Sequence, residues 1–423
     1  MNSKDNQYKN FGLDLIPNEW EVKKAGEIFE NISFKGYPNE PILAVTQDRG
    51  TMYRDQCGID IKTSDKSIES YKLVYEGNFI ISLRSFQGGL EYSGLRGIVS
   101  PAYTILNNKM DICSDYYKYL FKSKRFIDSL SSSVIGIRDG KQISYEVFKK
   151  LLIYYPPIQE QRKIANILST VDEQIDNIDN LIEKTKVLKK GLMQQLLTKG
   201  IGHKEFKETE VGVIPKQWEV KRLGDVRDFR RDNSFIDGDW IEAEHISSDG
   251  IRLIQTGNIG IGKFIEKKNG KYISEKSYID LNCKEVEEGD ILICRMAEPT
   301  GRSCVVPRLA EKMVTAVDCT ILKVDTEKYD VNFINYYINT EMNLKRISKF
   351  EQGSTRKRVS RTKLKEIPIV IPNIKEQHYI SSIILKVDDI INKYETKKVK
   401  LQKLKKGLMQ QLLTGKIRVK VDK

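Results

Sequence analysis

Nine basic side chains lie between Lys345 and Lys365, and a single acidic residue, Glu351, opposes them. Inside this stretch, the segment GSTRKRVSR combines glycine, hydroxyl groups and guanidinium groups. Such groups bind phosphate oxygens through charge, hydrogen bonds and main-chain amides. The segment therefore predicts contact with a nucleic acid, whereas the alternative is a merely solvated charged surface. Its candidate residues are Ser354, Thr355, Arg356, Lys357, Arg358 and Arg361.

A related segment, GIRDGKQIS, lies at the matching place in the first half of the chain. It carries Arg138 and Lys141 as candidates and is less basic than its counterpart. Recurrence at the same place in both halves favours a shared binding role over two unrelated charged surfaces.

Further polar candidates follow two apolar segments, GNFIIS and GDILIC, or lie where the two halves diverge most. Arginine can pair with guanine and glutamine with adenine, so these residues are candidate base readers. The alternative is that their loops only shape the domain. The candidates are Arg84, Ser85, Gln87, Arg295, Glu298, Arg302, His245, Gln255 and Asn258.

Catalytic motifs are not evident. GIRDGKQ misses the phosphate-loop spacing, TGNIGIG reverses the order of a dinucleotide fingerprint, and YYPPI lacks the residues that an amino-methyltransferase places around its prolines. The six cysteines form no CxxC pair, and the three histidines are not spaced as metal ligands. We expect reduced, mostly buried thiols, no metal, no cofactor in this chain and no enzyme activity of its own.

The overall charge points to an anionic partner. Lys and Arg number 71 against 58 Asp and Glu, which gives a formal net charge of +13. Such a balance favours a polyanion such as nucleic acid, although a basic protein can also be simply soluble. The polar start, MNSKDNQYKN, and the lack of a run of ~18 apolar residues predict a cytoplasmic protein with no membrane partner.

The chain is duplicated. LIPNEWEVKK at Leu15 is echoed by VIPKQWEVKR at Val213, and LKKGLMQQLLT occurs twice, at Leu188 and Leu404. The offset between the copies changes only in their front parts, which indicates variable loops joined to a fixed rear segment. The predicted divisions are residues 1–157, 158–200, 201–373 and 374–423.

Each rear segment predicts a long helix. Apolar residues step by four and three along it, which is the narrow stripe typical of a coiled coil. Because a lone helix of this kind is poorly stable in water, we expect the two helices to pair antiparallel, with a front domain at each end. The alternative is that each helix closes the core of its own domain. The predicted stripes are Ile164, Leu168, Val171, Ile175, Ile178, Ile182, Thr185, Lys189, Leu192 and Leu196, and Ile380, Ile384, Val387, Ile391, Tyr394, Lys398, Leu401, Lys405, Leu408 and Leu412.

The front segments are predicted to mix short alternating strands, NFIISL, DILICR and TAVDCTILKV, with turns such as DGDW, SSDG and EEGD. Helices are expected around DYYKYLFKSKRFIDSL and FINYYINTEMNLKRISKF. The predicted fold class is α/β (α+β), with two globular domains, two long antiparallel coiled-coil helices and an internal pseudo-twofold repeat.

Together these features resemble a known family. Two divergent domains each open with an IPxxWE segment, at Ile16 and Ile214, and close with a Glu-Gln helix start, in PPIQEQ and PNIKEQ. Each long helix then ends in KKGLMQQLL. This arrangement resembles the DNA-specificity subunit of Type I restriction-modification systems, and the resemblance spans nearly the whole chain.

The resemblance implies two target recognition domains, each of which reads one half of a split double-stranded DNA site with a fixed unread gap. It also implies two modification subunits that methylate adenine with S-adenosylmethionine, and two restriction subunits that use ATP and Mg. The alternatives are a coiled-coil scaffold that binds no DNA, and a self-sufficient enzyme that modifies nucleic acid.

Overall fold

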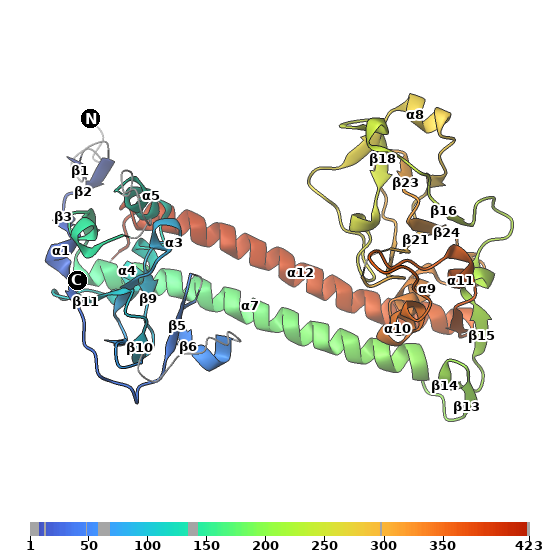
Figure 1. Cartoon of the computed structure of the whole chain (residues 1–423), viewed down its shortest axis with the longest axis horizontal. Coiled ribbons are helices and arrows are strands. Elements are labelled where there is room, and N and C mark those ends of the chain that lie inside the picture. The colour runs from blue at the N-terminus through green and yellow to red at the C-terminus, as the bar shows by residue number, and fades with distance from the viewer. Residues whose placement is uncertain are drawn as a thin grey trace. The chain divides into compact units, whose positions relative to one another are not determined.

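The computed structural model describes residues 8–11, 14–47, 49–57, 68–133, 143–296 and 298–420 (Figure 1). Two compact units divide the chain: Met1–Asn180 with Glu395–Lys423 form unit 1, and Leu181–Tyr394 form unit 2. Two long helices, α7 (Ile158–Lys199) and α12 (Ile374–Leu412), each contribute to both units. Within the described residues, no helix is both long and apolar enough to cross a membrane.

The front domain of unit 1 is built around a four-stranded antiparallel sheet in the order β4–β11–β8–β9. Its strands are β1 (Tyr8–Phe11), β2 (Asp14–Pro17), β3 (Glu21–Lys24), β4 (Phe29–Ile32), β5 (Leu43–Thr46), β6 (Gly50–Tyr53), β7 (Lys72–Val74), β8 (Phe79–Ile81), β9 (Glu91–Tyr92), β10 (Gly97–Val99), β11 (Thr104–Asn108) and β12 (Leu152–Tyr155). Its short helices are α1 (Ala25–Ile28), η1 (Arg54–Cys57), α3 (Ser85–Gly88), α4 (Ser114–Leu120), α5 (Lys124–Ser133) and α6 (Tyr145–Phe148).

Unit 2 has an equivalent sheet in the order β16–β24–β21–β22, and a second, five-stranded sheet in the order β17–β19–β18–β23–β20. Its strands are β13 (Phe206–Thr209), β14 (Gly212–Pro215), β15 (Glu219–Arg222), β16 (Phe235–Asp237), β17 (Ile246–Ser247), β18 (Ile251–Ile254), β19 (Lys271–Ile273), β20 (Glu285–Val286), β21 (Ile291–Cys294), β22 (Ser303–Val305), β23 (Met313–Thr315), β24 (Cys319–Leu322) and β25 (Pro368–Ile371). Its short helices are η2 (Leu223–Val226), η3 (Ala243–His245), η4 (Thr256–Asn258), α8 (Glu275–Asp280), α9 (Val331–Ile338), α10 (Glu341–Ser348) and α11 (Arg361–Lys365).

Local sequence explains where these elements start and stop. Asp330, Thr340 and Ser360 each accept a main-chain N–H in the first turn of α9, α10 and α11, so each satisfies a donor that the helix leaves free. TAVDCTILKV, expected as one strand, is two strands of different sheets, because a turn at Ala316 lets the chain leave β23 and enter β24. The two expected front-domain helices are likewise two helices each, α4 with α5 and α9 with α10.

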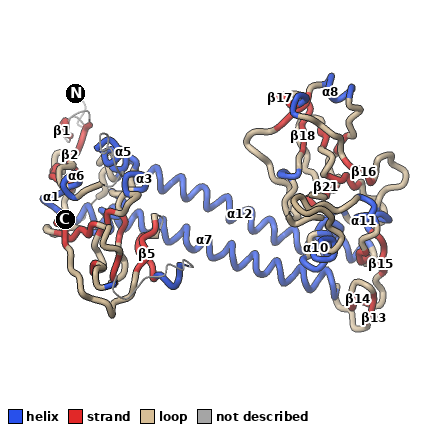
Figure 2. The backbone as a smooth tube through the Cα atoms, in the orientation of Figure 1, coloured by secondary structure: helices blue, strands red, loops and turns tan. Residues whose placement is uncertain are grey.

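The duplication extends to the sheets, which confirms the predicted mixed fold with an internal repeat. In unit 1, β3 pairs with β12, and in unit 2, β15 pairs with β25 in the same antiparallel sense. The central sheets also share one strand order. Among the described residues, β11 and β24 are each followed by three short helices, one more strand and one long helix (Figure 2).

The predicted coiled-coil stripes are confirmed, since every one of their twenty positions is buried or half-buried. In unit 1, Asp172 and Asp179 of α7 form ion pairs with Lys405 and Lys398 of α12, at 2.6 and 2.5 Å. As the residue numbers increase along α7, the residue numbers of the partners on α12 decrease, so the helices run antiparallel. In unit 2, Lys189 of α7 pairs with Asp388 of α12 at 2.6 Å in the same sense.

Each front domain is closed by the start of one long helix and the end of the other. In unit 1, Ile164 near the start of α7 and Leu412 and Leu413 at the end of α12 share a core with Trp20. In unit 2, the equivalent core contains Ile380, Leu196, Leu197 and Trp218. The start of each long helix therefore packs in the core of its own copy's front domain, as the alternative predicted. The repeated LKKGLMQQLLT segment at the end of each helix packs in the core of the other copy's front domain.

The same anchor fixes each front domain to its helix start. In unit 1 the indole N–H of Trp20 donates to Glu160 at 2.8 Å, and in unit 2 Trp218 donates to Glu376 at 3.1 Å. A nitrogen-bearing side chain that follows the other copy's helix also reaches each carboxylate. Arg418 contacts Glu160 and His203 contacts Glu376, both at 2.8 Å.

Candidate nucleic-acid interface

The candidate residues of unit 2 converge mainly on one end of its four-stranded sheet. Pairing of Asp237 with Thr320 and of Cys294 with Cys319 brings the end of β16, the start of β24 and the end of β21 to the same edge. The turns that follow belong to this edge. We call residues 237–240, 255–258 and 353–361, with Arg295 and Asp318, the basic edge.

Two connections attach the remaining segments to the basic edge. The N–H of Val359 donates to the carbonyl of Arg295 at 3.0 Å, which ties the GSTRKRVSR segment to the end of β21. The hydroxyl of Thr315 donates to the carbonyl of Ile254 at 2.9 Å, which holds the turn at residues 255–258 beside β23. Segments far apart in the sequence therefore form one surface.

The GSTRKRVSR segment is an exposed loop with a fixed base. Gln352 and Arg358 exchange two main-chain hydrogen bonds of 2.9 Å, and Gly353 turns the chain with a φ of +99°. The loop's side chains, Ser354, Thr355, Arg356, Lys357 and Arg358, are all exposed. A closed loop with exposed hydroxyl and guanidinium groups suits contact with phosphate oxygens.

Acidic side chains hold most of the loop's cations in place. Lys357 lies 3.5 Å from Glu351, Arg358 lies 2.8 Å from Asp318, and Arg361 lies 3.9 Å from Asp237. Within the described part of the chain, Arg356 has no acidic partner. The cations of these pairs are 40–67% exposed, so the pairs orient them and leave them accessible to an anionic partner.

Positive charge accumulates beside the loop as well. Burial, together with the nearby guanidinium groups of Arg227 and Arg361, lowers the pKa of Lys365 from its ordinary value. Such a shift arises where cations crowd one another. An anionic partner that approaches this surface would relieve the crowding.

Three of the candidate base readers are buried and already hydrogen-bonded. Arg295 donates to the carbonyls of Val317 and Val359 at 2.8 and 3.2 Å and pairs with Asp237 at 3.0 Å. Ser85 and Asn258 accept main-chain N–H groups at 2.8 and 3.0 Å. In the structure these side chains support their loops.

Arg302 has a similar supporting role. Its guanidinium donates to the carbonyls of Ile259, Thr256 and Pro299 at 2.7, 3.0 and 3.2 Å, so it ties the hairpin of β21 and β22 to the turn at residues 255–258. Gln255, at the start of that turn, is half-buried.

The remaining candidates lie elsewhere. His245 precedes β17, at the opposite end of the five-stranded sheet from Gln255, and its ring contacts Ser277 at 3.1 Å. Arg84 and Gln87 are exposed on the short helix α3 of unit 1. Arg138 and Lys141 lie outside the described residues. Contact of any of the candidates with DNA remains a prediction.

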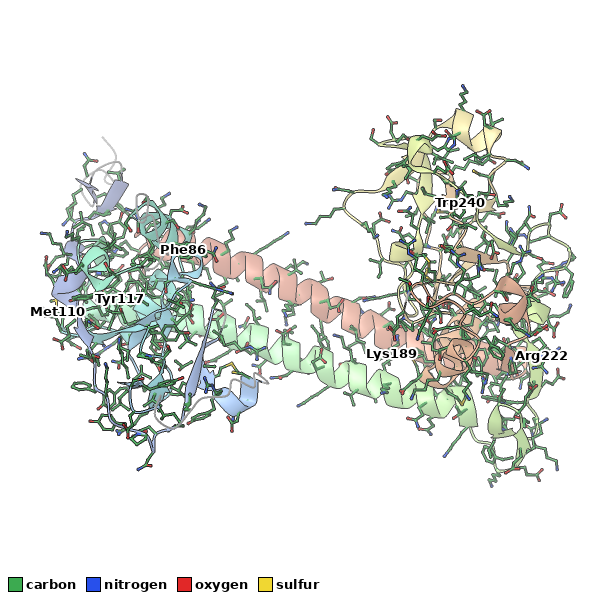
Figure 3. The ribbon with its side chains drawn as sticks, viewed as in Figure 1. Phe86, Met110, Tyr117, Lys189, Arg222 and Trp240 are labelled. Atoms are coloured by element: carbon green, nitrogen blue, oxygen red, sulfur yellow. The ribbon has the colours of Figure 1, made fainter. Side chains whose placement is uncertain are left out.

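Sequence reasoning missed Trp240, which lies on the basic edge and is 66% exposed (Figure 3). Its position in the turn segment DGDWIEAE, among acidic residues, was the available signal. A tryptophan between turn and charged residues has few apolar neighbours in the chain with which to form a core.

Other kinds of site find less support. Within the described residues, no group of three or more His, Cys, Asp and Glu is placed to hold a metal ion. Four of the six free cysteines are buried, and Cys57 and Cys113 are half-buried. Unit 1 has a groove of about 2170 Å³ between its front domain and its helix pair, lined by both basic and acidic side chains such as Lys118, Lys406 and Asp176.

Comparison with known proteins gives a consistent result over almost the whole chain. The family described as "Type I restriction modification DNA specificity domain" matches twice, at residues 17–186 and 215–403. The Type I restriction enzyme MjaVIII specificity subunit of Methanocaldococcus jannaschii is 28% identical, over 99% of this chain and 97% of that protein. The putative MjaX specificity subunit of the same organism is 29% identical, over 99% of this chain and 98% of that protein.

Solved structures share the fold at lower identity. A chain from work on complex assembly and conformational transition of the type I R-M system aligns with a TM-score of 0.58 and 16% identity, over 95% of this chain and 99% of that chain. The S subunit of a Type-I restriction-modification system from M. genitalium aligns with a TM-score of 0.55 and 15% identity, over 96% of this chain and 97% of that chain.

Proposed function

This chain belongs to the family of Type I restriction-modification DNA specificity subunits, and from that premise we propose that it reads a two-part DNA site whose halves are separated by a fixed number of unread base pairs. Each front domain would read one half. Because the two domains differ in their loops, the two half-sites would differ in sequence.

The repeated anchor is the observation that carries this proposal. Trp20 with Glu160, and Trp218 with Glu376, attach two divergent front domains to the long helices by the same contacts. Since α7 and α12 each run through both units, the attachment points are joined by continuous helix. We infer that this helical connection sets the spacing of the half-sites, as the spacing of half-sites in dimeric DNA-binding regulators follows from the geometry of the dimer.

The chemistry would come from partner subunits. We propose that two modification subunits, which use S-adenosylmethionine, methylate adenine at the site, and that two restriction subunits use ATP and Mg. This chain would supply recognition without catalysis, in keeping with relatives that are named specificity subunits.

The repeated segments offer matching surfaces for two modification subunits. Leu188 and Leu404 occupy the same position in the two LKKGLMQQLLT copies and are 55% and 50% exposed. Each leucine offers an exposed apolar contact on an otherwise charged helix. Two equivalent leucines suit two copies of one partner.

The test is to combine the chain with its modification subunit and map methylated adenines across DNA. We expect methylation within a two-part motif with one fixed gap. The matched control replaces both Leu188 and Leu404 by Glu, which should abolish methylation and leave DNA binding intact. Unspecific methylation, or methylation by the chain alone, would contradict the proposal.

The length of the helices gives a second test. Deletion of residues 174–180 and the facing residues 397–403 removes one heptad from each helix, including the Asp179–Lys398 pair, and keeps Asp172 with Lys405. Seven residues shorten a helix by roughly 10 Å, about three base pairs of duplex. Selection of bound sites from random DNA should therefore yield a changed gap or no binding, and unchanged half-sites. An unchanged gap would contradict the proposal.

A further inference from the structure

Trp240 is the exposed member of a set of three tryptophans. Trp20 and Trp218 are fully buried anchors, whereas Trp240 is 66% exposed. Tryptophan is enriched at binding interfaces because its ring offers a large rigid contact area with a polar edge. Its exposure on the surface of a folded domain therefore needs an explanation.

The backbone beneath Trp240 is held firmly. The N–H groups of Gly238 and Asp239 donate to the carbonyls of Cys319 and Thr315 at 2.9 and 3.0 Å. A side chain at position 238 would collide with the carbonyl of Thr315, at 2.3 Å. Asp239 is buried, accepts the N–H of Lys284 at 2.6 Å and pairs with the ammonium group of that lysine.

The ring itself is also oriented. The indole N–H of Trp240 donates to the carboxylate of Glu242 at 3.1 Å. Since both the backbone and the ring are fixed before a partner arrives, binding through Trp240 costs little conformational entropy. Glu242 is thus a positioning residue for the ring.

The surroundings of Trp240 suit nucleic acid better than protein. Asp237, three residues earlier, pairs with Arg295 and Arg361, and the exposed loop with Arg356 belongs to the same edge. Aromatic rings beside basic side chains are the usual combination for contact with bases and phosphates.

The first front domain has an analogous feature. β4 matches β16, because each is the edge strand that pairs with the central strand β11 or β24. Exposed aromatic residues, Phe34 and Tyr37, follow β4 as Trp240 follows β16. An exposed aromatic side chain at the same place in both copies indicates a shared use.

The acidic neighbour indicates which groove is contacted. The minor groove is narrow and strongly negative, so it disfavours Glu242 and Glu244. In the major groove, a carboxylate can accept from the amino group of cytosine, and an apolar side chain can pack on the methyl group of thymine. The pair of Trp240 and Glu242 therefore fits the major groove.

We propose that Trp240 is a specificity-determining residue that packs its ring against a thymine methyl group in the half-site read by the second front domain. This inference rests on the proposed function, which supplies the half-site. Trp240 would discriminate A·T from the other base pairs at one position, while the loop at residues 353–361 holds the adjacent phosphates.

The test uses the full chain and the duplex identified by methylation mapping, in which each thymine of that half-site is replaced in turn by uracil. Uracil lacks only the methyl group, so one replacement should weaken wild-type binding by about fourfold, as expected for one buried methyl group. The Trp240→Ala variant should bind about tenfold more weakly and no longer respond to that replacement. Trp240→Phe should retain part of both effects.

Phe206 provides the matched control. It is also exposed, but it lies on β13, in the two-stranded hairpin with β14, outside the basic edge. Phe206→Ala should leave affinity and uracil sensitivity unchanged. Because Trp240 is the exposed tryptophan, specific DNA should also change the intrinsic fluorescence of the wild-type chain, and this change should vanish in Trp240→Phe.

The outcomes separate the two proposals. If the chain shows no sequence preference at all, the proposed function fails. If it binds specifically and Trp240→Ala keeps wild-type affinity and uracil sensitivity, or the half-site contains no A·T pair, the role of Trp240 is overturned. Loss of methylation with unchanged DNA binding would make Trp240 a partner contact and would overturn it as well.

Discussion

At the residue scale, Asp290 shows how one position differs between the two copies. It is buried in the turn before β21, where its carboxylate accepts the N–H of Glu287 at 2.8 Å. Burial raises its pKa to about 6. The first copy has Asn78 at this place, and its amide oxygen accepts the N–H of Tyr75 at 2.9 Å. The turn therefore needs the acceptor and not the charge.

Replacement of Asp290 by Asn should change how stability depends on pH. Because the pKa of Asp290 is higher in the folded state than its ordinary value of 3.8, the folded protein binds the proton more tightly. This contribution to stability is complete below about pH 4 and is lost as the pH rises through 6. At pH 7.5, Asp290→Asn should raise the free energy of unfolding by about 1 to 3 kcal/mol.

Denaturant unfolding of wild type and variant between pH 4 and 7.5 measures this effect. The difference between them should grow with pH and level off above about pH 7. The reverse change, Asn78→Asp, is the matched control and should lower stability at neutral pH. Parallel pH profiles for Asp290→Asn and wild type would refute the assignment.

Residue types predicted the chemistry of the basic edge, but burial could not be read from them. Arg295 and Arg356 are both arginines in loops, yet one supports the backbone and the other is exposed. The difference depends on which carbonyls the folded loop brings near, and neither charge nor spacing encodes that. Trp240 was overlooked for the opposite reason, since its apolar type suggests a core position.

At the element scale, the exchanged helix ends determine which parts of the chain depend on one another. Leu413 and Leu197 are each fully buried, in the cores of unit 1 and unit 2 respectively. Each belongs to the copy whose front domain is in the other unit. A substitution at the end of one helix should therefore lower the stability of the other copy's front domain.

Leu413→Ala should lower the stability of unit 1, and Leu197→Ala that of unit 2. Each substitution leaves a cavity in a closed core and should cost about 2 to 5 kcal/mol. Hydrogen exchange resolved along the chain measures this, with each variant serving as the control for the other. Faster exchange in the front domain of the same copy, residues 201–373 for Leu413→Ala, would contradict the exchanged arrangement.

Periodicity predicted the two long helices and their pairing, because a stripe of apolar residues every three or four positions records which face is buried. Their antiparallel direction was predicted from the chain order, since parallel helices would place both front domains at the same end. It did not predict the exchange of ends, since a stripe does not identify the residues that cover it. The short strands were predicted less well. TAVDCTILKV carries no glycine or proline that would mark a break, and the turn within it depends on contacts with residues 238 and 239.

At the scale of the whole molecule, the net charge is +13, and the cations that contribute to it differ in whether they are paired with acidic side chains. Many cations are paired, such as Lys405 with Asp172 and Lys189 with Asp388 in the helix pair. The exposed loop at residues 353–361 carries Arg356, which has no acidic partner among the described residues, together with three cations that pair with acidic side chains. Electrostatic attraction to DNA should depend mainly on such residues rather than on the total charge.

Substitution of Arg356 and Lys357 by Gln should weaken the salt dependence of DNA binding. Each phosphate contact contributes about 0.9 to the slope of log affinity against log salt concentration, so the slope should fall by about 2. Affinity measured across a series of salt concentrations gives the slope directly. Substitution of Lys204 and Lys207, which are exposed outside the basic edge, is the control and should leave it unchanged. Equal slopes for both double variants would exclude the loop from phosphate contact.

Because the helix ends are exchanged, the second unit of the nascent chain can complete its core before the first unit does. Unit 2 is one continuous stretch, Leu181–Tyr394, whereas unit 1 needs Glu395–Lys423 to complete it. At the ~5 to 20 residues per second of ribosomal synthesis, the front domain made first waits roughly 13 to 50 seconds for the leucines that close its core. During that interval the apolar core residues of the first front domain stay uncovered on the ribosome. A chain truncated near its C-terminal end would have a complete second front domain and an incomplete first front domain.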